Sequence, residues 1–349
     1  MKIGLFTSQA SSIREQARLF NTLNLPTHTL EALPSIPFNN AVVFKPYEYG
    51  VFFIDPFFYI PQKFKDAVIY FTVDGIPDVF PILITNYRNI CRVYHCYANS
   101  QYSKANLEAV GIHVEGVVHN AVDTNVPTPN VAPIFDASMI GFYNYGNVKW
   151  YMDRKGLHLA TFILAKLANL GFRFHVLVGS DDGYFKYVVP KVRELVAYGD
   201  VIGDRPFNVV RIGNLPKFEV YRIYKSARFY IMPSLTEGFG LGVFEAMYNG
   251  VPALVNSYQT TSELLKDAPK ECVYLVKPHS TKQYRWGIRE LGLLMTFVYP
   301  DVEDFIDGFM YMLEHAKHSN TCREFVLERY TPSNYDVFRR IVLEWERVG

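Results

Sequence analysis

The segment that most constrains the fold of this 349-residue chain joins an apolar strand to a helix through a glycine-rich turn. The run 229–234 is apolar and ends in Pro-Ser, which is typical of a buried strand that stops there. Residues 237–242 read Glu-Gly-Phe-Gly-Leu-Gly, and the run 243–248 is helical in pattern and is followed by Asn-Gly. Such a turn presents free backbone N–H groups and the positive end of a helix dipole. The sequence therefore predicts an anion site built largely from main chain.

Two carboxylates, Glu237 and Glu245, bracket this turn. Negative charge is unfavourable beside a phosphate but suits the hydroxyl groups of a sugar or a ribose, so the pair indicates a nucleotide-sugar ligand. The spacing differs from the dinucleotide fingerprint, because Val243 stands three residues after Gly240, where that pattern has Gly or Ala. A second interpretation stays open on these residues alone, in which the glycines only permit a tight turn and close packing.

Length and composition limit the class of protein. A chain of 349 residues is too long for one ordinary core, which predicts two domains. Its net charge of +1 and the lack of a basic tract argue against nucleic-acid binding. The four cysteines have neither metal-ligand spacing nor a disulfide-dense pattern, so we expect small buried thiols in a cytoplasmic protein.

Membrane association is expected to be peripheral at most. No apolar run reaches the 18 or more residues that a membrane-spanning helix needs, and the first residues are typical of a strand and not of a signal peptide. The aromatic run 51–60 predicts a buried strand with a packed loop, and its alternative is a surface that meets a lipid-linked acceptor at the membrane.

The chain carries two series of alternating strands and helices, over residues 1–130 and 131–332. This alternation predicts an α/β protein with two Rossmann-like domains facing a cleft, and the proline-containing segment 120–133 is the expected linker. The strands expected are 2–7, 41–44, 51–54, 67–73, 91–97 and 113–118, then 139–143, 174–178, 208–212, 229–232, 252–255 and 272–275. The helices expected are 12–24, 103–110, 156–170, 217–226, 244–249, 301–315 and 333–348.

Residues 218–265 closely resemble the retaining glycosyltransferase family 4. The family carries a strand ending in Pro-Ser, the motif E-G-F-G-L, a second glutamate that opens E-A-M, and G-x-P. This chain matches these at 233–234, 237–241, 245–247 and 250–252. Residues 119–125 are similar to the family's P-N-G-V-D segment, and residues 154–157 to its R/K-K-G helix start. The resemblance implies a GT-B fold whose second domain holds most of the donor, with the helix 333–348 packing back on the first domain.

The resemblance implies roles for particular residues near the glycine-rich turn. Glu237 would accept hydrogen bonds from hydroxyls of the donor sugar, and Glu245 would bind the ribose hydroxyls. The backbone N–H groups of Phe239, Gly240 and Leu241 would hold the sugar and the distal phosphate.

The resemblance implies further roles in stabilising the leaving diphosphate and in binding the nucleobase. Lys155 and Arg154 would neutralise the diphosphate as it leaves, because negative charge grows there when the glycosidic bond breaks. Gly213, Asn214 and Leu215 stand where the family places the nucleobase. With these cations and no Asp-x-Asp triplet in the sequence, we expect neither a metal nor another cofactor.

Two positions depart from the family pattern. Asp74 stands where the family has a histidine that faces the donor sugar and phosphate. It is the one side chain that we would assign to a base or acceptor role, or it marks an unusual donor or a weakened enzyme. The first loop, 7–12, lacks the usual glycines, so substrate choice is expected to differ.

The sequence as a whole predicts a retaining, metal-independent glycosyltransferase. It would move a sugar from a nucleoside-diphosphate-sugar to a hydroxyl of an unidentified glycan, lipid or small-molecule acceptor. Two alternatives remain at this stage. One is another GT-B nucleotide-sugar enzyme such as an epimerase, and the other is a nucleotide-sugar-binding protein that has lost transfer activity.

Overall fold

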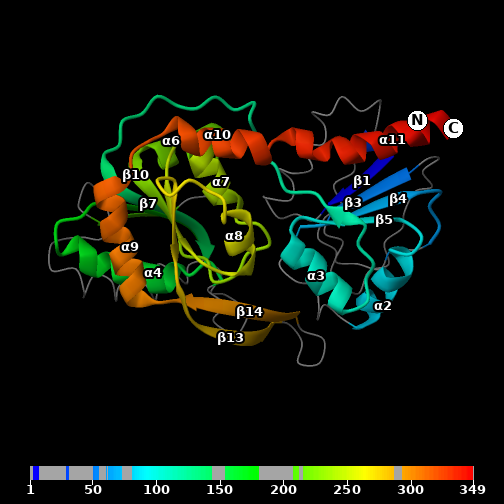
Figure 1. The fold of residues 1–349 in the computed structure, drawn as a ribbon, viewed down its shortest axis with the longest axis horizontal. Helices are drawn as coiled ribbons and strands as arrows, with labels where there is room; N and C mark the ends of the chain where they lie inside the picture. Colours follow the sequence, from blue (N-terminus) through cyan, green and yellow to red (C-terminus); the bar gives the residue numbers. More distant parts are fainter. Residues whose placement is uncertain are drawn as a thin grey trace. The chain divides into compact units, whose positions relative to one another are not determined.

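A computed structural model of the chain describes residues 3–7, 29–30, 50–54, 60, 62–72, 81–143, 154–180, 207–211, 215–286 and 293–348. Contacts divide the chain into two units, each built on its own parallel sheet (Figure 1). The first unit is Met1–Asp123, Gln283–Met295 and Arg329–Gly349, and the second is Thr124–Lys282 and Thr296–Glu328. The predicted α/β class with two parallel sheets is confirmed. The chain first passes from one unit to the other after Asp123, inside the segment 120–133.

The first unit contains a parallel sheet whose six described strands have the order β2-β1-β3-β4-β5-β6. Their bounds are β1 Ile3–Thr7, β2 Thr29–Leu30, β3 Gly50–Ile54, β4 Ala67–Phe71, β5 His95–Ala98 and β6 Gly116–Val117. Every residue of β3 and β4 is buried, which is the pattern of a parallel sheet covered on both faces.

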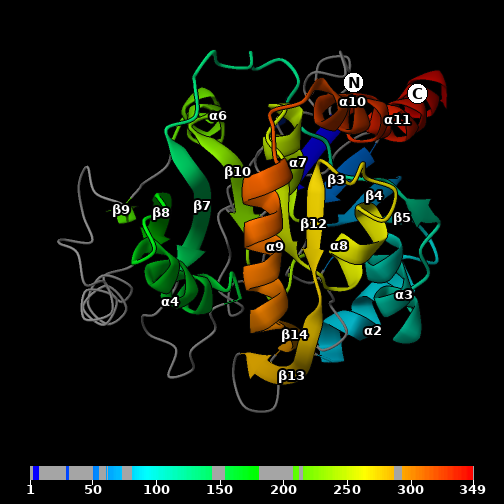
Figure 2. The ribbon, with the colours of Figure 1, turned by 60° about the vertical axis from the view of Figure 1, so that its left-hand side comes forward.

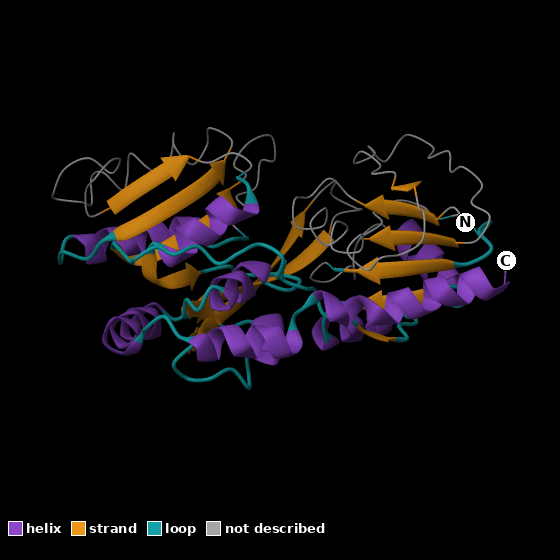
Figure 3. Cartoon of the chain, turned by 90° about the horizontal axis from the view of Figure 1, so that it is seen from above, coloured by secondary structure: helices purple, strands orange, loops and turns teal. Residues whose placement is uncertain are grey.

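Alternate residues of β3 and β4 face different helices. Val51 and Phe53 belong to the apolar cluster that includes residues of α2 (Pro81–Ile90) and α3 (Gln101–Ala109). Phe52 instead belongs to the cluster with Phe338 and Trp345 of α11 (Asp336–Val348), which covers the opposite face (Figure 3). A Cβ atom on Gly50 would overlap the Trp345 indole, so this glycine lets α11 approach the sheet.

The second unit contains a parallel sheet of order β12-β11-β10-β7-β8-β9. Its strands are β7 Phe135–Tyr143, β8 Phe174–Ser180, β9 Phe207–Arg211, β10 Ala227–Met232, β11 Ala253–Asn256 and β12 Val273–Val276. Its helices are α4 Leu157–Ala168, α6 Lys217–Lys225, α7 Leu241–Tyr248, α8 Gln259–Leu264, α9 Val302–His315 and α10 Asn320–Arg329. Numbered from β7, the strands follow the Rossmann order 3-2-1-4-5-6.

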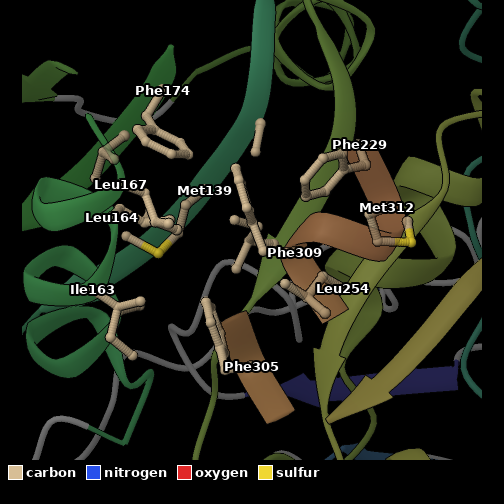
Figure 4. Packing of buried hydrophobic residues seen from close by; sticks show 14 of the residues in the cluster. Met139, Ile163, Leu164, Leu167, Phe174, Phe229, Leu254, Phe305, Phe309 and Met312 are labelled. Carbon is tan, nitrogen blue, oxygen red and sulfur yellow. The ribbon is translucent and has the colours of Figure 1, made fainter. Parts of the chain in front are cut away.

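Phe309 of α9 lies at the centre of the core of the second unit (Figure 4). Its ring centroid is 5.3 Å from that of Phe172, 5.5 Å from that of Phe174 and 5.4 Å from that of Phe229. These partners come from β8, from the residues before it and from β10. One helix side chain thereby joins two strands that are distant in sequence, one of which, β10, leads into the site.

Several elements were not predicted from the sequence. α2 begins at a proline, and its residues are a mixture of apolar and polar types, while α10 buries only Cys322, Phe325 and Val326. β13 (Pro278–Trp286) and β14 (Leu293–Pro300) pair as a separate two-stranded sheet (Figure 2). The division between the units passes through both strands. The strand expected at 41–44 and the helix expected at 12–24 lie outside the described residues.

The prediction of buried free thiols is wrong. Cys91 and Cys96 form one disulfide and Cys272 and Cys322 form another. The Cα atoms of the two pairs lie 5.5 Å and 5.3 Å apart, because the turn after α2 folds back into β5 and α10 passes the start of β12. Spacing along the chain could not show either approach. Among the described residues, no helix is both long enough and apolar enough to cross a membrane.

Candidate functional site

The centre of the second sheet is the point at which its strand order reverses. The chain leaves β7 toward β8 on one side and leaves β10 toward β11 on the other. In open parallel sheets, ligands bind outside the carboxyl ends of the strands at such a switch point. Two segments reach this place, residues 154–156 before α4 and residues 233–240 before α7. The backbone N–H of Leu235 donates to the carbonyl oxygen of Arg154 at 2.8 Å, so these segments lie side by side.

The carboxylate of Glu237 accepts hydrogen bonds from three side chains at this edge. The Lys155 ammonium and the Ser234 hydroxyl, at 2.9 Å, both donate to Oε1. The Arg154 guanidinium donates to Oε2 at 3.3 Å. Only 8% of Glu237 is exposed. This arrangement brings together three of the residues that the sequence singled out.

Burial and charge act in opposite directions on Glu237. Burial by itself raises the pKa of the carboxyl group, but Lys155, Arg154 and the hydrogen bonds from Lys155 and Ser234 outweigh it and hold the pKa below its usual value. The group is therefore an ionised hydrogen-bond acceptor near neutral pH and is not suited to donate a proton.

Both helices at the switch point begin at a glycine in the left-handed region. Gly156 precedes α4 with φ 63° and Gly240 precedes α7 with φ 80°, and neither helix has a side-chain cap. A Cβ atom on Gly156 would overlap the carbonyl oxygen of Pro233, so Gly156 needs to be glycine for space as well as for backbone angle. Phe239 is buried with its ring 4.9 Å from that of Phe244, which anchors the turn before α7.

A second buried carboxylate, Glu245 of α7, is only 4% exposed and contacts α6. Lys217 Nζ donates to its Oε1 at 2.6 Å and the Tyr224 hydroxyl donates to its Oε2 at 3.2 Å. Burial and the neighbouring Glu245 charge raise the pKa of Tyr224 well above its usual value, so this hydroxyl stays protonated and remains a donor. Sequence reasoning missed Lys217 and Tyr224. Their spacing of seven residues places both on one face of a helix, but that spacing does not indicate that the face packs against α7.

The loop between β10 and α7 is also held from β14. The Asn256 side-chain amide donates to the carbonyl oxygens of Ser234 at 2.9 Å and Val298 at 2.8 Å. The backbone N–H of Val298 donates to the Leu235 carbonyl oxygen at 2.8 Å. Asn256 and β14 were not singled out from the sequence, because their role depends on contact with a distant loop.

Other predicted site residues can be placed only in part. Asp74, Gly213 and Asn214 lie outside the described residues. Leu215 is 37% exposed and stands two positions before Lys217. Within the described part of the chain, no three His, Cys, Asp or Glu side chains gather closely enough to hold a metal ion. The expectation of a metal-independent reaction stays a prediction.

The arrangement suits a ligand that carries both hydroxyl groups and negative charge. The two carboxylates can accept hydrogen bonds from hydroxyls, while two cations and the first N–H groups of α4 and α7 can face an anion.

Comparison with known proteins gives concordant matches. Residues 206–293 match the family described as Glycosyl transferases group 1. Uncharacterized glycosyltransferase 335 of Sulfolobus islandicus rod-shaped virus 1 is 22% identical over 301 residues, which are 80% of this chain and 81% of that protein.

Solved structures support the same fold. Sucrose-phosphate synthase from Thermosynechococcus elongatus superposes with a TM-score of 0.63 at 13% identity, over 100% of this chain and 98% of the other. Anabaena HepE in complex with UDP and glucose gives a TM-score of 0.63 at 13% identity, over 98% of this chain and 99% of the other.

Proposed function

We infer that this chain is a group 1 glycosyl transferase, which transfers a sugar from a nucleotide-sugar donor to an acceptor hydroxyl with retention of configuration. The observation that carries the inference is the cluster of Glu237, Lys155 and Arg154 at the switch point of the second sheet. Glu237 lies within the stretch that matches the family, and the two cations reach it from the start of α4. The roles of single residues given below are proposals.

The donor sugar and its phosphates are proposed to bind at the turn before α7. Glu237 accepts hydrogen bonds from sugar hydroxyls, because its lowered pKa keeps it ionised. The N–H groups of Phe239, Gly240 and Leu241 face the sugar and the distal phosphate, where the positive end of the helix dipole adds to their effect.

The leaving diphosphate is proposed to be stabilised by Lys155 and Arg154. In the reaction, the bond between the anomeric carbon and the phosphate oxygen breaks while the acceptor oxygen bonds to the same face of that carbon. The acceptor's proton passes to the departing phosphate, so no side chain of the described residues has to act as the base. Charge on the phosphate grows as the bond breaks, so fixed cations stabilise the transition state more than the bound donor.

The nucleoside half of the donor is proposed to reach Glu245. Its buried carboxylate accepts hydrogen bonds from the ribose hydroxyls, and Leu215 lies on the chain segment that leads to this place. Gly213 and Asn214 keep the nucleobase role that the resemblance implies, and Asp74 keeps the base or acceptor role, all as predictions; the acceptor is unidentified. Contact with a membrane surface also stays a prediction.

The first experiment is a thermal-shift panel of UDP, GDP and ADP and their sugar conjugates. The proteins are the wild type, Glu245→Gln, and the control Glu324→Gln, which changes an exposed carboxylate on α10. A ligand at a hundredfold excess over its dissociation constant stabilises the folded state by about 2.7 kcal/mol. We expect one nucleotide to stabilise the wild type and the control by this order and Glu245→Gln by much less.

Incubation of the selected donor with and without candidate acceptors separates the remaining possibilities. Transfer with an unchanged anomeric configuration, read by NMR, supports the proposal. Isomerised donor without an acceptor would favour an epimerase, and tight nucleotide binding without any turnover would favour a binding protein. If no nucleotide shifts the melting temperature, the donor-site assignment is wrong.

A further inference from the structure

α6 and α7 face each other through a matched row of polar and aromatic side chains. Lys217, Tyr221 and Tyr224 follow one another at spacings of four and three residues, which places them on one face of α6. Glu245 and Tyr248, three residues apart, form the facing row on α7. The ring centroids of Tyr221 and Tyr248 lie 5.8 Å apart, so the two helices are also in aromatic contact beside the carboxylate of Glu245.

Two donors from α6 hold the carboxylate of Glu245, each on a different oxygen. Lys217 binds Oε1 and Tyr224 binds Oε2, and the two donors stand at opposite ends of the helix. Contacts on both oxygens oppose rotation of the carboxylate plane. Each carboxylate oxygen has two lone-pair positions, so these two bonds leave a further acceptor position on each oxygen.

A carboxylate held in this way is matched to a pair of neighbouring hydroxyl groups. The 2′- and 3′-hydroxyls of a ribose can each donate to one oxygen, whereas a 2′-deoxyribose can satisfy only one. A site built to hydrogen-bond a substrate hydroxyl discriminates strongly against the analogue that lacks it, because a buried polar group is left unmatched. Discrimination between ribose and 2′-deoxyribose therefore requires that the carboxylate keeps its orientation and does not rotate to find another hydrogen-bond donor.

We propose that Lys217 is a positioning residue that, with Tyr224, fixes Glu245 for the ribose diol and thereby selects ribonucleotide over 2′-deoxyribonucleotide donors. The inference rests on the proposed function, which assigns Glu245 to the ribose. Lys217 acts through Glu245, and nothing in this role requires contact between Lys217 and the donor. Its ammonium also balances the charge of a carboxylate that is only 4% exposed, so its removal frees Glu245 to rotate.

The test compares dissociation constants of UDP, GDP and ADP with those of their 2′-deoxy counterparts by calorimetry. The proteins are the wild type, Lys217→Met, Lys217→Arg, Tyr224→Phe and Glu245→Gln. Lys225→Met is the matched control, because Lys225 stands on the last turn of the same helix and contacts neither described carboxylate of the site. Melting temperatures are recorded for all variants, so that loss of stability is separated from loss of selectivity.

For the nucleotide that binds, we expect the wild type and Lys225→Met to prefer the ribo form on the order of 10- to 100-fold. In Lys217→Met this ratio falls to about threefold or less, by weaker binding of the ribo form with little change for the deoxy form. Lys217→Arg restores part of the ratio, and Tyr224→Phe lowers it less than Lys217→Met because a neutral hydroxyl is lost in place of a cation.

The outcomes distinguish a failure of the role proposed for Lys217 from a failure of the assignment of Glu245 to the ribose. If Lys217→Met melts earlier but keeps the wild-type ratio while Glu245→Gln loses it, Lys217 only joins the helices and the inference is wrong. If Glu245→Gln also keeps the wild-type ratio, the assignment of Glu245 to the ribose fails first. Should Lys217→Met not fold, the ratio in Tyr224→Phe decides, since unchanged selectivity there would overturn the two-donor arrangement.

Discussion

Replacing Gly156 with alanine should separate the two segments that bring Lys155 and Glu237 together. Gly156 has φ 63°, in the left-handed region that a side chain disfavours. A Cβ atom there would overlap the carbonyl oxygen of Pro233 and lie 2.9 Å from its carbonyl carbon. Both obstacles are main-chain atoms, which cannot swing aside as a flexible side chain does. The strain is relieved only if the loop after β10 moves away from the start of α4.

The cost has a backbone part and a contact part. A non-glycine residue in the left-handed region costs about 1–2 kcal/mol, and forcing an extra methyl group into a packed site costs about 1–3 kcal/mol. We therefore expect Gly156→Ala to lower the free energy of unfolding by about 2–5 kcal/mol. Gly171 provides the matched control, because its φ is 94° and a Cβ atom there would meet nothing within 4 Å. Gly171→Ala should lose only the backbone part, about 1–2 kcal/mol.

The functional consequence follows from the neighbours of Gly156. Lys155 precedes it directly, and the hydrogen bond from Leu235 to Arg154 lies at the same junction. A shift of about 1 Å in a reacting site can cost on the order of 100-fold in rate. We expect kcat/KM of Gly156→Ala to fall by that order, and Gly171→Ala to keep the wild-type value.

The assay pairs urea unfolding with kcat/KM for the donor selected by the thermal-shift panel, under the same buffer conditions. Equal losses of stability in the two alanine variants would show that the contact between residue 156 and Pro233 adds nothing to the cost of the left-handed backbone. A Gly156→Ala protein that is destabilised yet fully active would refute the link between this junction and the site.

Two further predictions concern the disulfides and a half-buried histidine. Replacing Cys272 and Cys322 by alanine opens a loop of sequence separation 50 and should lower the free energy of unfolding by about 4 kcal/mol. The same change at Cys91 and Cys96, with separation 5, should lower it by about 2 kcal/mol. Equal losses in urea unfolding would contradict a dependence on loop length. Burial holds the pKa of His318 below its usual value, so this group contributes stability that is fully present above about pH 6.5 and is lost as the pH falls through the lowered pKa. The free energy of unfolding should therefore fall more steeply between about pH 7 and 5 in the wild type than in His318→Gln, and parallel curves would contradict it.

The fold class and the central motif of the site could be predicted from the sequence because both depend on short-range patterns. Alternating strands and helices produce a parallel sheet wherever they occur, since crossover helices must cover its faces. The run from Phe229 to Glu245 contains its own strand end, turn and helix start. Lys155 was also found, because it stands in a local helix-start motif.

The partners of these residues could be read only from the tertiary structure. Lys217, Tyr224 and Asn256 are ordinary residues in ordinary helices and strands, and packing alone brings their donors to Glu245 and to the carbonyl of Ser234. The same holds for the two disulfides, which require Cα atoms within a few ångströms whatever the separation along the chain. Sequence patterns determine which elements form, because hydrogen bonding and burial act over a few neighbours. Which distant side chains meet is decided by how those elements pack, and that packing sets the charge and orientation of the site.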